Sequence, residues 1–71
     1  NHMTPEQIKK SFGENIKRKR LEKNFSQEEL ALNAGLDRTY ISGVERGKRN
    51  VSIVNIHKIS IALGIEIKEL F

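Results

Sequence analysis

Residues 26–50 read SQEELALNAGLDRTYISGVERGKRN, and this stretch decides the fold. Ser26 followed three residues later by Glu29 has the spacing of a capping box, in which the two residues bond reciprocally to each other's backbone N–H groups. A short helix is therefore predicted to begin here. Gly35 ends it, because glycine takes the positive φ that a sharp redirection of the chain requires.

A second helix is predicted directly after this turn. The Asp37 side chain can accept hydrogen bonds from the free N–H groups of the next turn, so the helix should run from Arg38 to about Arg46 and stop at Gly47. Two short helices joined by a tight glycine turn form a helix-turn-helix, a motif that lays its second helix in the major groove of DNA.

A longer helix is predicted upstream of the motif. The sequence TPEQ at residues 4–7 supplies a capping hydroxyl, a proline at the first helical position and a glutamine that completes a capping box. This helix should run to about Lys23, with Asn24 as a left-handed cap and Gly13 loosening it midway. Its buried stripe is expected to comprise residues spaced four apart: Ile8, Phe12 and Ile16.

The C-terminal part completes the predicted fold. A fourth helix is expected from near Ser52 to Leu63, capped by Gly64, and a last helical turn from about Glu66 to Leu70. The predicted fold is therefore an all-α bundle of five short helices.

Length and charge limit the possible functions. The 71 residues fit one small domain, placed at residues 4–71, and residues 1–3 are interpreted as a cloning remnant. The net charge of +4 arises in the first fifty residues, which hold 11 basic and 7 acidic side chains, and this favours a polyanionic partner. Without cysteine there is no disulfide framework, and no run approaches the ~18 apolar residues of a membrane span, so the cytoplasm is the expected compartment.

The chain from Phe12 to Phe71 resembles the Cro/CI-type, or XRE-family, DNA-binding domains. The residues that carry this resemblance are Gln27, Gly35, Tyr40-Ile41-Ser42, Glu45, Gly47, Ala62-Leu63-Gly64 and Glu69-Leu70-Phe71. Within the family, LDRTYISGVERGKRN is most like the controller proteins of restriction-modification systems. The resemblance implies a five-helix, lambda-repressor-like domain that binds double-stranded DNA as a homodimer.

Helical spacing divides the second helix of the motif into two faces. The residues expected to face the core are Ile41 and Val44, with Ala34 and Leu36 before them. The residues expected to face DNA are Arg38, Thr39, Ser42 and Arg46. Arg38 can offer two donors to guanine O6 and N7, which favours base contact over a merely solvated role. Gly43 reads nothing, so specificity should depend on Arg38, Thr39 and DNA shape.

Further DNA contacts are expected around this helix. Tyr40 has two open roles: its ring packs on Val44, or its hydroxyl reaches a phosphate or probes a kinked base step, as similar tyrosines of controller proteins suggest. Gln27 lies in the first turn of its helix, where a phosphate is attracted, although a neutral capping role is the alternative. A basic loop beside the groove is expected to contact the DNA backbone through Lys48, Arg49 and Asn50.

The family resemblance also implies a structural ion pair. Arg20 and Glu45 occupy the positions of a buried pair that ties the first helix to the end of the third and orients the reading helix. Lys19 departs from the family, because its position is usually apolar. Its charged end must therefore reach past the edge of the core or be drawn toward DNA.

Enzymatic and cofactor-dependent functions find no support in the pattern. His57 lies on a predicted helix without a nearby cysteine or second histidine, and no phosphate-binding loop or nucleophile motif is present. No cofactor, metal or catalytic role is expected.

The C-terminal region carries more apolar side chains than one small core can take. Ile53, Ile56, Ile59 and Leu63 form one stripe expected to face the core. A second set is expected to form a dimer interface, although part of it can instead pack under the last helical turn: Val54, His57, Ile61, Ile65, Ile67, Leu70 and Phe71.

Together these features predict a dimeric transcription regulator that binds a near-palindromic operator. Its occupancy of a promoter would block RNA polymerase or recruit it by contact. An antitoxin or phage-like repressor is the alternative of the same class, and a protein-interaction module on the same fold is the alternative of another class.

Overall fold

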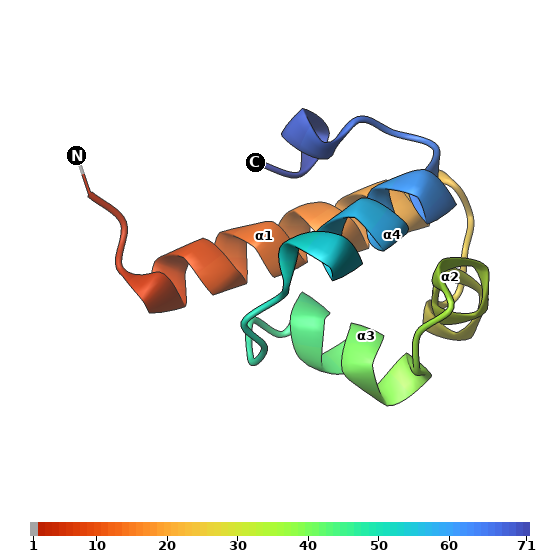
Figure 1. The fold of residues 1–71 in the computed structure, drawn as a ribbon, viewed down its shortest axis with the longest axis horizontal. Helices are drawn as coiled ribbons and strands as arrows, with labels where there is room; N and C mark the ends of the chain where they lie inside the picture. Colours follow the sequence, from red (N-terminus) through yellow and green to blue (C-terminus); the bar gives the residue numbers. More distant parts are fainter. Residues whose placement is uncertain (1) are drawn as a thin grey trace.

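The computed structural model describes residues 2–71, and over that range the protein is all-helical. Its elements in chain order are α1 (Pro5–Glu22), α2 (Gln27–Ala34), α3 (Arg38–Glu45), α4 (Ile53–Leu63) and the 3₁₀ helix η1 (Ile67–Leu70) (Figure 1). The predicted fifth helix is thus one 3₁₀ turn, closed by the Glu69 N–H donating to the Glu66 carbonyl at 3.0 Å. Asn1, part of the segment interpreted as a cloning remnant, lies outside the described residues.

The predicted helix starts are confirmed, with one correction. The Thr4 hydroxyl accepts from the Gln7 N–H at 3.1 Å and the Ser26 hydroxyl from the Glu29 N–H at 3.0 Å, and both capping boxes are complete. Asp37 stands at the N-cap of α3 with extended backbone, but its side chain makes no capping hydrogen bond. The tight turn before it, and not a carboxylate cap, therefore sets the start of α3.

The predicted helix stops all take left-handed backbone conformations: Asn24 (φ 60°), Gly35 (φ 70°), Gly47 (φ 74°) and Gly64 (φ 68°). At Gly35 this geometry lets the next N–H, that of Leu36, donate to the Ala31 carbonyl at 2.9 Å. The chain consequently reverses between α2 and α3 within residues 35–37, which brings the two helices into contact.

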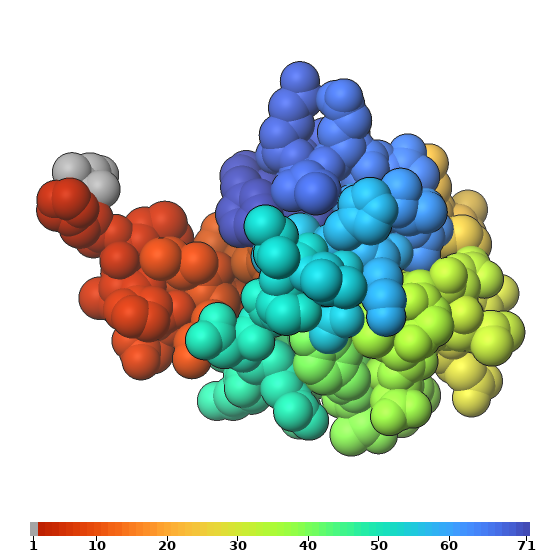
Figure 2. Space-filling view, viewed as in Figure 1, coloured from red at the N-terminus to blue at the C-terminus, as the bar shows by residue number. Residues whose placement is uncertain are grey.

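Every helix contributes to one apolar core. Its buried residues are Phe12, Ile16, Leu30, Ala31, Ala34, Ile41, Val44, Ile59, Leu63 and Leu70, with Leu36 and Ile56 partly buried against them. Two predicted core residues are wrong: Ile8 is 47% exposed and Ile53 is 78% exposed. Ile8 lies on the end of α1 that projects beyond the body of the molecule (Figure 2), and Ile53 is the first residue of α4.

Gly13 does not loosen α1, as was expected, but marks its closest approach to α3. A Cβ atom at this position would clash with the Val44 carbonyl oxygen and lie 2.8 Å from that of Glu45. One turn further along the contact, a Cβ at Gly47 would lie 2.9 Å from the Lys10 Cα. The backbone of α1 therefore packs directly against the end of α3 and the loop that follows.

Polar contacts fasten η1 to α1. The Asn15 side-chain amide donates to the Leu70 carbonyl at 2.9 Å, and the Lys19 ammonium lies 3.4 Å from the Glu69 carboxylate. Lys19 thus reaches past the edge of the core, one of the two expected solutions. The Glu66 backbone N–H, which donates to the Glu69 carboxylate, lowers the pKa of Glu69, and the Lys19 ammonium lowers this pKa further.

Gly13→Ala should destabilise the protein by about 2 kcal/mol or more, because the added methyl group must push α1 away from the α3 backbone. In an ordinary helix position the same change would stabilise. Urea unfolding checks this, with Lys17→Ala on the exposed side of α1 as the control. A midpoint for Gly13→Ala at or above that of the parent would contradict the close packing.

Candidate nucleic-acid interface

The outer face of α3 carries the side chains that were predicted to face DNA. Arg38, Thr39 and Arg46 are exposed and Ser42 is half-buried, whereas Ile41 and Val44 on the opposite side are buried in the core. In Figure 2 this helix and the loop after it form the lower edge of the molecule. The predicted division of α3 into two faces is therefore confirmed.

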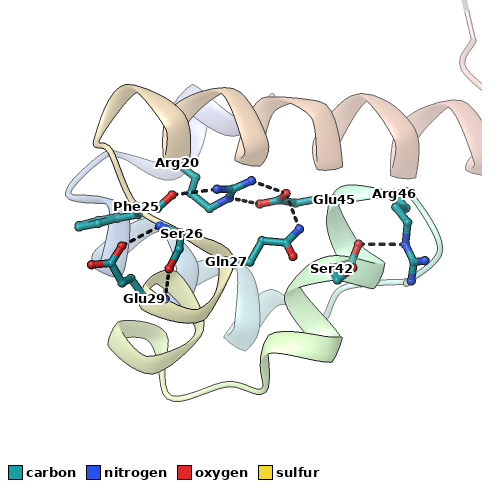
Figure 3. Close-up of polar contacts among 8 residues, drawn as sticks. All are labelled: Arg20, Phe25, Ser26, Gln27, Glu29, Ser42, Glu45 and Arg46. Atoms are coloured by element: carbon teal, nitrogen blue, oxygen red, sulfur yellow. Dashed lines mark hydrogen bonds and ion pairs between the residues drawn. The ribbon is translucent and has the colours of Figure 1, made fainter.

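A buried ion pair holds this helix in place. Arg20 Nε lies 2.7 Å from Glu45 Oε2 and its Nη2 lies 3.1 Å from Glu45 Oε1, a bidentate arrangement (Figure 3). The side chains are only 9% and 3% exposed. The Arg20–Glu45 pair implied by the family resemblance is therefore confirmed.

The pair is completed by two further hydrogen bonds. Arg20 Nη1 donates to the Phe25 carbonyl at 2.8 Å, and Gln27 Nε2 donates to Glu45 Oε1 at 3.0 Å (Figure 3). With these, no buried side-chain nitrogen or oxygen among the described residues lacks a partner. The network joins α1, the start of α2 and the end of α3, so it fixes the orientation of the reading helix.

Gln27 has a role that the sequence did not indicate. Its amide contacts Glu45, 18 positions away, and no local pattern predicts a contact at this separation. Gln27 also lies in the first turn of α2, so its contact with a phosphate stays a prediction.

Tyr40 combines the two roles left open for it. Its ring is half-buried and packs against the core, and its hydroxyl accepts a hydrogen bond from Asn55 Nδ2 at 3.0 Å. The Arg49 guanidinium carbon lies 5.4 Å from the centroid of the ring. Asn55, on α4, was missed because sequence reasoning placed it on no functional face. The contact of the hydroxyl with DNA remains a prediction.

The exposed cations lie together around α3. Arg46 is anchored by its Nε, which donates to the Ser42 carbonyl at 3.3 Å, and Arg38 extends from the start of the helix. The loop residues Lys48, Arg49 and Asn50 are also exposed. Such a group of cations beside a helix suits the phosphates that border a DNA groove.

Other functional chemistry finds little material in the described chain. Within residues 2–71, no three or more histidine, cysteine or acidic side chains are grouped so that they could hold a metal ion. None of the helices there is both long and apolar enough to cross a membrane.

Comparisons with known proteins point to one family. Residues 16–70 match the family HTH_3, described as helix-turn-helix. The chain is 55% identical over 65 residues to the control protein C.MunI of Mycoplasma sp, covering 90% of this chain and 88% of the relative. It is 55% identical over 64 residues to the control protein C.BamHI of Bacillus amyloliquefaciens, covering 89% and 79%.

A solved structure shares the fold as well. The restriction-modification controller protein C.AhdI from Aeromonas hydrophila superimposes with a TM-score of 0.86 at 55% identity, over 87% of this chain and 94% of that protein.

Glu45→Ala should destabilise the fold by about 3–5 kcal/mol, because it leaves the Arg20 guanidinium buried and uncompensated. The matched control is Glu22→Ala, which removes the carboxylate of exposed ion pairs and should cost less than about 1 kcal/mol. Chemical unfolding of both variants measures the difference. Equal midpoints would show that the buried pair does not hold the structure together.

Proposed function

We propose a function from the premise that this chain belongs to the helix-turn-helix family HTH_3. The protein is a DNA-binding transcription regulator of the controller type, and it binds a near-palindromic operator as a homodimer. The observation that carries this proposal is the exposed face of α3, held by the buried network of Arg20, Glu45 and Gln27. The 55% identity to control proteins supports the same conclusion.

The recognition step follows from the two faces of α3. With α3 in the major groove, Arg38 can donate two hydrogen bonds to one guanine, and Thr39 and Ser42 can contact neighbouring bases. Lys48 and Asn50 in the loop, and Gln27 at the start of α2, are placed for phosphates, whose contacts fix the register of the protein. Bound beside a promoter, the dimer regulates by occupancy, either by excluding RNA polymerase or by contacting it.

The proposed dimer interface uses the exposed apolar side of α4 and the chain end. Val54 is 59% exposed and Ile61 is 65% exposed, with the exposed His57 between them. Ile67 and Phe71 extend this surface, and Ile65 is half-buried beside it. Leu70 must be removed from the predicted interface, because it is fully buried in the core of its own protomer.

A two-fold axis at this surface would explain the paired recognition helices. Monomers seldom expose a continuous apolar surface of this kind. An isologous interface there would place two α3 helices about one DNA turn apart, roughly 34–36 Å, which matches a near-palindromic operator.

Arg38→Ala and Lys48→Ala should weaken DNA binding in different ways. Loss of a bidentate base contact should remove about 1–3 kcal/mol of discrimination, whereas loss of a phosphate contact should weaken all sequences alike and lower the salt dependence. Binding of both variants to a duplex selected from a random pool, and to its scrambled form, tests this over a range of salt. Equal losses of Arg38→Ala on both duplexes would remove Arg38 from base recognition.

Ile61→Glu should shift a wild-type dimer toward monomer and weaken operator binding, because it places a charge in the proposed interface. Leu32→Glu, at an exposed apolar residue of α2, is the matched control and should leave the dimer intact. Sedimentation at micromolar concentration gives the oligomeric state, and circular dichroism verifies the fold. A wild type that stays monomeric both free and on DNA would overturn the dimer.

A further inference from the structure

Gly43 leaves an open strip on α3 that a side chain from the following loop covers. A Cβ atom at position 43 would lie 3.2 Å from both Cγ and Nε of Arg49. Gly43 is nevertheless buried, since the Arg49 side chain lies across it. The position that was expected to read nothing is therefore occupied by an arginine from outside the helix.

The end of the Arg49 side chain is also held. Its guanidinium carbon lies 5.4 Å from the Tyr40 ring centroid, within the range of a cation–π contact. Tyr40 is itself fixed by its packing on the core and by the hydrogen bond from Asn55. An arginine ordered in this way before binding loses less conformational freedom when it contacts DNA.

The location of this arginine matters for recognition. Position 43 follows Thr39 by four residues, so the two are neighbours on the surface of α3. Arg49 thus extends the predicted DNA-facing surface along one side of the helix, although it comes from the loop. Lys48, the preceding residue of the loop, is exposed and has no comparable contact with α3.

We propose that Arg49 is a specificity-determining residue that contacts a base edge beside those read by α3, with Gly43 and Tyr40 as its positioning residues. This inference rests on the proposed function, because it requires that α3 lies in the major groove. It assigns to Arg49 a role beyond the backbone contact expected from the sequence. The absence of a side chain at Gly43 is what gives the arginine its path.

Arg49→Lys separates charge from shape, since lysine keeps the charge but lacks the planar guanidinium that stacks and bonds in pairs. Fluorescence anisotropy should show that its preference for the selected duplex over the scrambled one falls at least about fivefold, the low end for a bidentate base contact. Lys48→Ala, the control, should weaken both duplexes alike. Equal effects of Arg49→Lys on both duplexes, or no effect, would overturn this inference alone. A wild type with no preference at all would overturn the proposed function and this inference with it.

Gly43→Ala tests the positioning role without harming the fold. Alanine favours a helix over glycine, and the atoms nearest the new methyl group belong to the Arg49 side chain, so the melting temperature should stay level or rise. The preference for the selected duplex should nevertheless fall, because Arg49 is displaced. In an Arg49→Ala background, Gly43→Ala should cause no further loss of preference. An unchanged preference for the single variant, or an additive loss in the double variant, would overturn the inference.

Discussion

The buried contact between Arg20 and Glu45 is the interaction on which the rest of the structure depends. Two parallel hydrogen bonds, at 2.7 and 3.1 Å, join α1 to the last residue of α3. The charges are affordable in the interior only because Phe25 and Gln27 satisfy the remaining donors and acceptors around them. The exposed face of α3 is consequently positioned by groups that never need to touch a ligand.

Much of the fold could be predicted from the sequence because it is encoded locally. Capping boxes at Thr4 and Ser26 and left-handed stops at Gly35 and Gly64 depend on residues within one helical turn of each other. Periodicity was less reliable at the edges. Spacing identifies the apolar face of a helix but not where along its axis the core ends, so Ile8 and Ile53 were wrongly placed inside.

The candidate site was predictable in outline and not in its connections. The DNA-facing residues of α3 follow from its spacing, and the ion pair follows from the family resemblance. The Gln27–Glu45 and Asn55–Tyr40 hydrogen bonds join separate helices, and no pattern of neighbouring residues reports on such contacts. Gly13 was misread for the same reason, since its meaning lies in the carbonyl groups that face it across the interface with α3.

The backbone contact at Gly13 has a mechanical consequence. No flexible side chain lies between α1 and the end of α3 there to act as a cushion, and the ion network locks the same two helices one turn further on. The reading helix cannot tilt without carrying α1 with it. An operator with altered half-site spacing must therefore be accommodated by bending of the DNA or by sliding between protomers, while each protomer moves as a rigid piece.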